Sequence, residues 1–431
     1  MDLYEIFLEH PEITTDSRNC PAGSIFFALK GENFNANEFA AKALENGCSY
    51  AVVDQAEYAV DQRYILVKDT LRSLQELANQ HRQQLGTKII GITGTNGKTT
   101  TKELIASVLK EKYKIHFTQG NLNNHIGVPL TLLKLKPEHQ LAIIEMGANH
   151  PGEIKQLCEI AQPNFGIITN VGKAHLEGFG SFEGVMKTKA ELYDYISANG
   201  LGIFINDDND YLKQMAAKSS VIADKRITYA LKCHPDLSMV TGRVLSNDPF
   251  LTMECQTGNT FQVKTHLIGA YNAENVLAAV TIGHFFGMKN VQIIQGLENY
   301  EPVNNRSQFT VTAKNKLIVD AYNANPTSMQ AAIQNFAAMQ VEAKTAILGE
   351  MLELGQLSAD EHQNIINLLK EKQISKVLLV GKAFQDCASD YASFGTVEDL
   401  IVWLTENKIE NQTILIKGSR GIRLEKTISL L

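Results

Sequence analysis

The sequence predicts an α/β protein of three domains. Its 431 residues exceed the size of a single hydrophobic core and, at roughly 150 residues per domain, suffice for about three. Short β-branched runs alternate with helical patterns along the whole chain, which is typical of α/β folds with mostly parallel sheets. A glycine-rich loop at residues 90–101 joins one such run to a helical pattern.

Composition and charge exclude several classes of protein. The hydrophobic share of 44% and the charged share of 20% are ordinary for a globular protein and exclude a disordered chain. The net charge of -7 provides no basic field, so we expect no nucleic-acid partner. The six cysteines lie far apart, and neither a signal peptide nor a long apolar stretch is found. We therefore expect a cytoplasmic protein with reduced thiols and no membrane span. We also expect a monomer, although these observations do not bear on it.

The first predicted domain covers residues 1–86. Strand-like runs at 25–29, 50–53 and 65–67 are separated by glycines and polar turns, with helical patterns between them. These features predict a small α/β domain.

The second predicted domain covers residues 87–304. A β-branched run leads into the glycine-rich loop and then into a helical pattern, and more apolar strands follow with helices between them. The predicted elements are strands at 88–93, 141–144, 165–168 and 202–205, helices at 103–114 and 272–286, and an antiparallel patch at 239–267. This pattern predicts a mostly parallel sheet with an antiparallel extension.

The third predicted domain covers residues 305–431. Apolar strands at 317–319, 345–348, 377–380 and 413–416 are interleaved with helical patterns. This alternation predicts a compact doubly wound domain.

The glycine-rich loop at residues 90–101 is the strongest local signal for function. Its glycines let successive N–H groups face phosphate oxygens, Lys98 adds a positive charge, and the Thr99 hydroxyl can bind Mg²⁺. The strict phosphate-loop motif would have a glycine where Ile92 stands, so this loop is a variant. The residues expected to bind nucleotide here are Gly94, Thr95, Asn96, Gly97, Lys98, Thr99 and Thr100.

Glu145 follows directly after the strand at 141–144, at the edge where open sheets bind ligands. A carboxylate there suits Mg²⁺ beside a triphosphate. A guanine-reading N-K-x-D motif is absent, because Asn315 and Lys316 are not followed by an aspartate at the required place. The sequence therefore favours ATP over GTP.

Four strings make the chain resemble the Mur ligase family over essentially its whole length. Two of them, GNLNNHIGVP (120–129) and NVGKAHLE (170–177), resemble the family together with the glycine-rich loop. The other two, DAYNANP (320–326) and LGEMLELG (348–355), resemble the branch that adds D-alanyl-D-alanine. The resemblance implies an N-terminal domain for a UDP-linked substrate, a central P-loop ATPase domain and a C-terminal Rossmann-like domain.

The resemblance also implies a reaction. An ATP-dependent amide ligase of this branch adds D-alanyl-D-alanine to UDP-N-acetylmuramoyl-tripeptide through an acyl phosphate and forms the pentapeptide precursor of peptidoglycan. The cofactors expected from it are ATP and Mg²⁺. Such a transfer needs positioning and charge neutralisation, because two anions must be brought together.

Site residues follow from the resemblance at matching positions. Thr99 and Glu145 are expected to hold one Mg²⁺, with His175 and Lys189, if carbamylated, at a second. Residues expected to act in catalysis are Lys98, His175, Lys189 and Arg306. Without the resemblance, a lone histidine in a glycine-rich loop and a lysine on a helix face are more often structural or solvated.

Further residues are expected to bind the three substrates. Asn272 and Asn275 share a helix face and hold ATP in the family, although Asn272 would also suit a helix cap, and Tyr271 replaces the family histidine. The resemblance places Arg306 at the phosphates and Asp320 at the ribose. The residues expected at the UDP-linked substrate are Ser17, Arg18 and Lys30, and those expected at the dipeptide or the ATP end are Asn323, Asn325 and Glu350.

Three alternative functions remain open from the sequence. The chain could be another Mur-type amino-acid ligase, a P-loop kinase, or a nucleotide-binding partner protein without ligase activity. The partner protein is disfavoured because Glu145, His175, Lys189, Arg306 and Asp320 occur together.

Overall fold

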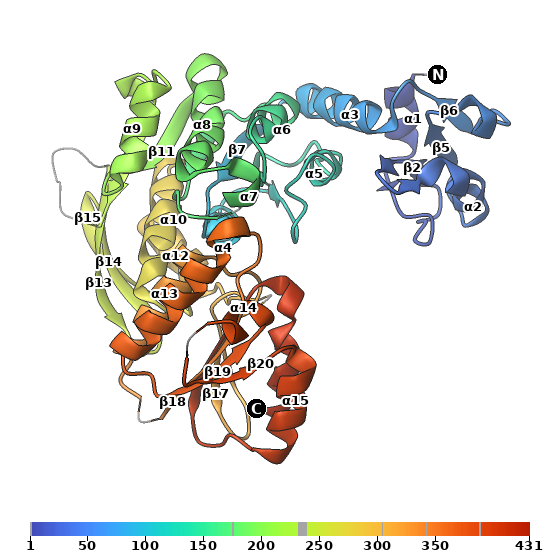
Figure 1. Cartoon of the computed structure of the whole chain (residues 1–431). Helices are drawn as coiled ribbons and strands as arrows, with labels where there is room; N and C mark the ends of the chain where they lie inside the picture. The colour runs from blue at the N-terminus through green and yellow to red at the C-terminus, as the bar shows by residue number, and fades with distance from the viewer. Residues whose placement is uncertain (1, 175, 232–238, 304, 342, 388) are drawn as a thin grey trace.

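The protein consists of three α/β units arranged around separate sheets. The computed structural model describes residues 2–174, 176–231, 239–303, 305–341, 343–387 and 389–431. Sheets of four, nine and six strands, together with a two-stranded hairpin, form within these residues. The expected α/β class with mostly parallel sheets is therefore confirmed. Figure 1 shows the N-terminal unit held away from the rest at the end of helix α3.

The N-terminal unit is built on a four-stranded parallel sheet with the order β1-β2-β5-β6. Its strands are β1 (Ile13–Thr14), β2 (Ile25–Phe27), β5 (Tyr50–Val53) and β6 (Tyr64–Leu66), with the hairpin β3 (Lys30–Gly31) and β4 (Phe34–Asn35) beside them. Its helices are α1 (Leu3–Glu9), α2 (Ala40–Glu45) and α3 (Thr70–Leu85). The predicted strands are present, each within two residues of its expected ends.

Helix α3 connects the first unit to the second and packs on both. Asp69 caps its start by accepting a hydrogen bond from the Arg72 N–H (2.8 Å), and Gly86 ends it in a left-handed conformation (φ 65°). The buried Leu74 and Leu77 belong to an apolar cluster that contains residues of both units. The N-terminal unit is thus held by the apolar face of one helix.

The central unit contains the nine-stranded sheet, ordered β15-β14-β13-β12-β11-β10-β7-β9-β8. Strands β8 to β13 pair in parallel, and β13, β14 and β15 pair antiparallel. The strands are β7 (Lys88–Thr93), β8 (Ile115–Phe117), β9 (Leu141–Glu145), β10 (Phe165–Ile168), β11 (Gly202–Asn206), β12 (Arg226–Ala230), β13 (Val240–Asn247), β14 (Leu251–Thr257) and β15 (Asn259–Lys264). The predicted antiparallel extension is confirmed.

Helices cover both faces of the central sheet. One face packs against α4 (Lys98–Leu109), α10 (Ala273–Phe285) and α11 (Asn290–Glu298). The other packs against α5 (Gly127–Leu132), α6 (Glu153–Ala161), α8 (Phe182–Asn199) and α9 (Asp210–Lys218), with the short α7 (Leu176–Phe179) before α8. Because both faces are covered, the central strands are buried along their length.

The third unit is a doubly wound sheet with the order β16-β17-β21-β18-β19-β20, parallel except for β16. Its strands are β16 (Gln308–Val311), β17 (Lys316–Asp320), β18 (Lys344–Gly349), β19 (Lys376–Val380), β20 (Ala392–Phe394) and β21 (Thr413–Lys417). Helices α12 (Pro326–Ala338) and α13 (Ser358–Glu371) cover one face, and α15 (Val397–Glu406) covers the other, while α14 (Lys382–Gln385) follows β19.

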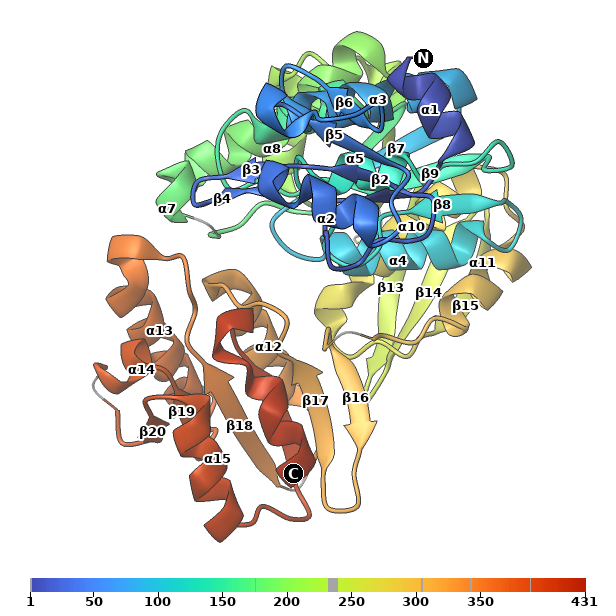
Figure 2. The ribbon, with the colours of Figure 1, turned by 90° about the vertical axis from the view of Figure 1, so that its right-hand side faces the viewer.

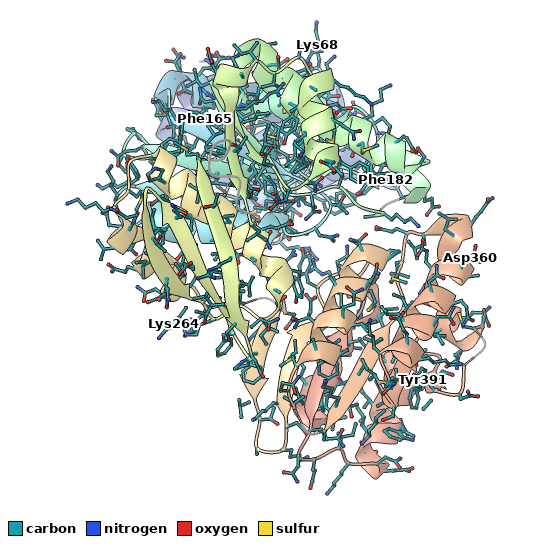
Figure 3. All side chains as sticks on the ribbon, turned by 90° about the vertical axis from the view of Figure 1, so that its left-hand side faces the viewer. Lys68, Phe165, Phe182, Lys264, Asp360 and Tyr391 are labelled. Carbon is teal, nitrogen blue, oxygen red and sulfur yellow. The ribbon has the colours of Figure 1, made fainter. Side chains whose placement is uncertain are left out.

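The third unit contacts the central unit through the loops and helix ends at the carboxyl ends of its strands (Figure 2). Asn325 donates a hydrogen bond to the Asn96 side chain (2.7 Å). Lys173 forms an ion pair with Glu361 on α13 (2.9 Å). Asp360, beside Glu361, lies on the side of the third unit that faces the central unit (Figure 3). These contacts place the two sheets' ligand-binding edges opposite each other.

Candidate active site

One large cavity lies between the central and third units. Its volume is about 780 Å³, and it is lined by loops that follow strands of both sheets. The predicted site residues in its wall are Thr95, Asn96, Gly97, Lys98, Thr99, Thr100, Glu145, Asn272, Asn275, Arg306, Asp320, Asn323 and Asn325. The fold therefore brings together residues that are more than 200 positions apart in the sequence.

The phosphate loop follows β7 and turns through Gly94 and Gly97. Both have positive φ angles, of 143° and 76°. A Cβ atom on Gly97 would lie 2.7 Å from the Asn275 side-chain oxygen, and one on Gly94 would overlap Thr169. Only glycine can occupy these positions without displacing a neighbour.

Helix α4 begins at Lys98 rather than at residue 103, where the sequence pattern placed it. The three threonines at 99–101 are poor helix formers, but Thr99 and Thr101 are buried in the helix. An early start brings the free N–H groups of the first turn to the phosphate loop.

Lys98 lies folded back over its own loop. Its ammonium donates hydrogen bonds to the carbonyl oxygens of Gly94 (2.7 Å) and Thr95 (3.1 Å). Burial lowers the pKa of this lysine, and the nearby charge of Arg306 lowers the pKa further, while Glu145 opposes the shift. The two carbonyl oxygens thus hold the ammonium inside the loop. Phosphate oxygens of a bound nucleotide would replace them as its hydrogen-bond acceptors.

Glu145 ends β9 inside the cavity and is buried. Its Oε1 accepts hydrogen bonds from the Thr99 hydroxyl (3.2 Å) and from the Asn123 amide (2.9 Å). Within the described residues, no three His, Cys, Asp or Glu side chains cluster so as to hold a metal ion. Mg²⁺ at a triphosphate typically takes one or two protein oxygens and completes its shell with phosphates and water, so Thr99 and Glu145 fit it.

His175, expected at a second metal, lies outside the described residues. Lys189, the other residue expected there, is on α8 and is 3% exposed. Its Nζ lies 5.4 Å from the centre of the Phe179 ring. Burial lowers the pKa of Lys189 to about 7, and the charge of Lys98 contributes, against the opposing effect of Glu153 and Glu191.

Asn272 and Asn275 are buried at the start of α10, and neither caps the helix through its side chain. Asn272 donates to the carbonyl oxygen of Ile268 (2.8 Å) and accepts from the Asn275 amide (2.9 Å). Asn275 in turn accepts a hydrogen bond from the Thr101 hydroxyl (3.0 Å). This chain of bonds joins α10 to α4 directly behind the phosphate loop.

The third unit contributes a cation held against an aromatic ring. The Arg306 guanidinium lies 3.6 Å from the centre of the Tyr322 ring, and Arg420 lies 5.3 Å from it on another loop. Stacking of this kind holds a guanidinium plane in a fixed orientation. Tyr322 was not among the predicted residues, although it lies inside the DAYNANP string.

Asp320 is paired with a residue that the sequence did not connect to it. The buried Lys417 lies 2.6 Å from the Asp320 carboxylate and also donates to the Asn323 carbonyl (3.3 Å). The two residues end neighbouring parallel strands in the same register. In the sequence, each of the two residues stands directly after an apolar run that forms a strand. That shared position is the signal that could have suggested the pair.

Four predicted substrate residues lie outside the cavity wall. In the N-terminal unit, Arg18 is exposed and pairs with Asp16 (2.9 Å), Ser17 is beside it, and Lys30 pairs with Asp54 (2.9 Å). Glu350 accepts a hydrogen bond from the Ala383 N–H (2.9 Å). The carboxylate of the same string that lines the cavity is that of Glu353, whose φ is 66°.

Two asparagines that the prediction missed position the loop and the carboxylate. Asn170 accepts from the Asn96 N–H (2.9 Å) and donates to the Asn96 carbonyl (3.1 Å), which holds the phosphate loop against the end of β10. Asn123 holds Glu145 as described above. Both lie in strings that carried the family resemblance, and that placement was the available signal.

None of the helices in the described part of the chain combines the length and the apolar character that crossing a lipid bilayer requires.

Three family models match the chain. They are the Mur ligase family catalytic domain at residues 11–82, the Mur ligase middle domain at 92–283 and the Mur ligase glutamate ligase domain at 305–420.

Two similar proteins are the UDP-N-acetylmuramoyl-tripeptide--D-alanyl-D-alanine ligases of Escherichia coli and Bacillus subtilis. The first is 36% identical over 97% of this chain and 93% of its own length. The second is 34% identical over 96% of this chain and 92% of its own length.

Solved structures agree with these sequence matches. The crystal structure of MurF from Acinetobacter baumannii has a TM-score of 0.85 and 32% identity, covering 97% of this chain and 92% of that one. MurF from Thermotoga maritima in complex with ADP has a TM-score of 0.85 at 24% identity, covering 100% and 98%, and supports the likeness of fold.

Proposed function

Because this chain belongs to the Mur ligase family, we propose that it is an ATP-dependent ligase that adds D-alanyl-D-alanine to UDP-N-acetylmuramoyl-tripeptide. The observation that carries the proposal is the shared cavity. The phosphate loop and Glu145 face Arg306, Asp320 and Asn325 across it. A nucleotide held by the phosphate loop and Glu145 would therefore face the residues of the third unit. The amine of the dipeptide is proposed to enter on that side of the cavity.

The proposed reaction forms an amide in two steps. A carboxylate oxygen of the tripeptide attacks the terminal phosphorus of ATP, the bond from that phosphorus to the bridging oxygen breaks, and ADP leaves. The amine of the dipeptide then attacks the acyl carbon, a proton is lost, and inorganic phosphate departs. Both steps bring negative groups together, so the residues of this chain contribute mainly charge and position.

Lys98 and Arg306 are the proposed sources of protein charge at the phosphates. Lys98 leaves the carbonyls of Gly94 and Thr95 and turns to the β- and γ-phosphate oxygens. Arg306, held flat against Tyr322, presents two parallel N–H groups to the transferring phosphoryl group. Asn272 and Asn275 support the loop from behind, and Asp320 is proposed to reach the ribose.

Thr99 and Glu145 are the proposed protein ligands of Mg²⁺, which when bound neutralises charge between the β- and γ-phosphates. Asn123 keeps Oε1 of Glu145 beside the Thr99 hydroxyl. We propose His175 as a ligand of a second ion, as the resemblance implies.

We propose that Lys189 becomes carbamylated. A lysine whose pKa is lowered to about 7 carries much neutral amine at neutral pH, and the neutral amine is the form that attacks carbon dioxide. The new N–C bond gives a carbamate, and one proton is released. The carbamate carries a negative charge near Lys98. It would therefore serve as a carboxylate at a position where the sequence has a lysine.

We propose three domains with separate roles: residues 1–86 bind the UDP-linked substrate, residues 87–304 bind ATP, and residues 305–431 form the C-terminal ligase domain. Ser17, Arg18 and Lys30 then receive the UDP end, with Arg18 and Lys30 leaving Asp16 and Asp54 to bind phosphate. Asn323, Asn325 and Glu350 are proposed on the acceptor side. We propose a monomer, and we propose the cytoplasm as its location because ATP is available there.

Phosphate release tests the proposal. The protein would be mixed with ATP, Mg²⁺ and UDP-N-acetylmuramoyl-tripeptide, with and without D-alanyl-D-alanine, and the nucleotide-linked product would be weighed by mass spectrometry. We expect sustained phosphate release and a pentapeptide product only with both substrates. Sustained release without an amide product would instead indicate an ATPase, whereas a substrate that gains the mass of a phosphoryl group without phosphate release would indicate a kinase.

A further inference from the structure

Lys102 is a buried lysine beside the proposed metal ligand. It lies on α4, three residues after Thr99, so both side chains project from the same face of the helix. The side chain of Lys102 is 1% exposed, and its Nζ lies 3.5 Å from Oε2 of Glu145, whose side chain is 2% exposed. The Phe117 ring lies on another side of the ammonium, at 5.9 Å.

The two oxygens of Glu145 have different surroundings. Oε1 accepts hydrogen bonds from Thr99 and Asn123. Among the described residues, neither Oε2 of Glu145 nor Nζ of Lys102 has a hydrogen-bond partner, so the ion pair is the interaction between them. An interior carboxylate and ammonium are costly unless they are paired, so this arrangement needs a reason beyond packing.

We propose that Lys102 is a positioning residue, which holds Oε2 of Glu145 so that Oε1 alone faces Thr99 and receives the metal ion. The inference rests on the proposed metal-dependent ligase reaction and adds a residue to it. The carboxylate cannot turn about its axis while Lys102 holds one oxygen and Asn123 the other. The metal ion then finds one oxygen of fixed direction beside the Thr99 hydroxyl.

The sign of the effect separates positioning from simple electrostatics. Lys102 is a positive charge close to a site for a positive ion, so its removal by charge alone would tighten metal binding. If Lys102 instead positions Glu145, its removal lets the Glu145 carboxylate turn away from Thr99, and metal binding becomes weaker. Removal of groups that orient a metal ligand typically lowers affinity by about 10-fold to 100-fold.

The test measures Mn²⁺ binding to the full chain in the presence of ADP, by the loss of the free-ion signal in electron paramagnetic resonance relative to the same Mn²⁺ and ADP without protein. For Lys102→Met we expect Mn²⁺ affinity to fall by about 10-fold or more. ADP affinity with the metal chelated should stay within about twofold, because Lys102 is not among the residues that line the cavity. The Mg²⁺ concentration for half-maximal activity should rise in parallel.

Two further variants keep the result interpretable. Lys110→Met removes a lysine at the solvent-exposed end of the same helix and should bind Mn²⁺ like the wild type. Lys102→Gln retains polarity, although its amide is too short to reach Oε2. It should show the same loss, and it carries the test if Lys102→Met does not fold.

The outcomes separate this inference from the proposed function. Unchanged or tighter Mn²⁺ binding in the Lys102 variants, with normal binding in the wild type, overturns the positioning role alone. Failure of the wild type to take up Mn²⁺ with ADP overturns the proposed metal-dependent function and this inference together.

Discussion

At the scale of single residues, Lys98 shows how the cation of the proposed phosphate site is held. Its ammonium rests on two carbonyls of its own loop, and these bonds replace water at modest cost. Phosphate oxygens carry a full negative charge and make stronger, charge-assisted bonds, so the lysine exchanges one set of partners for the other.

We expect Lys98→Ala to lower the turnover number by at least about 10²-fold, because one preorganised charge at the transferring phosphoryl group is lost. The free energy of unfolding should change little, since within the described residues the hydrogen bonds of this lysine go to its own loop. Phosphate release and urea unfolding measure the two quantities. Retained activity would remove the phosphate-loop assignment.

Lys189 gives a residue-scale prediction about pH. Its pKa is lowered to about 7 in the folded protein and returns to its ordinary value of 10.5 on unfolding. Between these values the unfolded chain binds the extra proton, so this lysine makes stability rise with pH through that window. Relative to Lys189→Met, the wild type should gain up to about 1.4 kcal/mol per pH unit from about pH 8 to about pH 9.5.

Urea unfolding in buffer free of carbon dioxide measures this difference. A stability difference that stays flat with pH would mean that the lysine is not neutral in the folded protein. Added bicarbonate should stabilise the wild type alone and leave the rise with pH in place, because the carbamate forms in the folded protein while the unfolded lysine still takes up a proton.

Residue types in the cavity were largely predictable, but their partners were not. Thr99, Glu145 and Asn275 could be named because each sits at a strand end or a helix start. Lys102 escaped notice because a lysine in a helical pattern ordinarily faces water. Its burial follows from the position of β9, which the local sequence of α4 does not encode.

At the scale of elements, the start of α12 joins local stability to the site. Asn325 caps the helix by accepting a hydrogen bond from the Ser328 N–H (2.9 Å), and Pro326 follows at the first helical position. The same side chain donates to Asn96 of the phosphate loop. One asparagine thus ends a loop, starts a helix and joins two units.

Asn325→Ala should therefore reduce the free energy of unfolding by about 1 kcal/mol, the ordinary value of such a cap. It should also raise the KM for ATP, because the side chain of Asn96 loses its hydrogen bonds to Asn325. Thermal unfolding and steady-state kinetics would measure these effects, and Gln334→Ala, at an exposed position farther along the same helix, serves as a comparison. An unchanged KM would limit Asn325 to helix capping.

His116 on β8 makes this edge of the central sheet sensitive to acid. Burial lowers its pKa to about 4, and the neighbouring His139 adds to this effect, while the hydrogen bond to the Thr131 carbonyl (2.9 Å) opposes it. The unfolded chain takes up the proton near pH 6.5, so stability is lost as the pH falls from about 6.5 to about 4.

His116→Gln should lose less stability than the wild type over that range, by about 2 kcal/mol, since glutamine does not titrate. Chemical unfolding at both ends of the range gives the comparison. Equal losses in the two proteins would show that other groups carry the acid sensitivity.

The strands were predicted more accurately than the start of α4. Apolar β-branched runs at 88–93 and 165–168 form strands with the expected ends, because both faces of the sheet are buried. The run of threonines at 99–101 suggested loop, yet it is helical. Packing of α10 against α4 and the bond from Thr101 to Asn275 outweigh the weak local preference.

At the scale of the whole molecule, catalysis depends on how the third unit meets the central one. The Lys173 to Glu361 ion pair and the Asn96 to Asn325 hydrogen bonds cross between them. The Lys173 side chain is 56% exposed and that of Glu361 is 11% exposed, so this ion pair contributes at most about 1 kcal/mol. Contacts of this size can open and close during a catalytic cycle.

Small-angle scattering can measure this closure. We expect the wild type to become more compact with an ATP analogue and UDP-N-acetylmuramoyl-tripeptide. Lys173→Gln should shift the balance towards the open arrangement by up to about fivefold, because it removes an ion pair of the size given above. Lys155→Gln, an exposed lysine elsewhere on the central unit, should behave like the wild type. No compaction of the wild type would contradict domain closure.

The division into α/β units and the family resemblance could be predicted from sequence, since each depends on local patterns. The relative placement of the units could not. It depends on pairs such as Asn96 with Asn325, which are separated by more than 200 residues and carry no shared pattern. The same limit explains why Glu350 and Glu353 could not be ranked as cavity residues.

The most direct test of the central claim follows one oxygen atom. UDP-N-acetylmuramoyl-tripeptide would carry heavy oxygen in its terminal carboxylate, and the released phosphate would be examined by mass spectrometry after turnover with ATP and D-alanyl-D-alanine. The account predicts one labelled oxygen in the phosphate and an amide-linked pentapeptide product. Unlabelled phosphate would contradict an acyl phosphate, and absence of the amide would contradict the ligase itself.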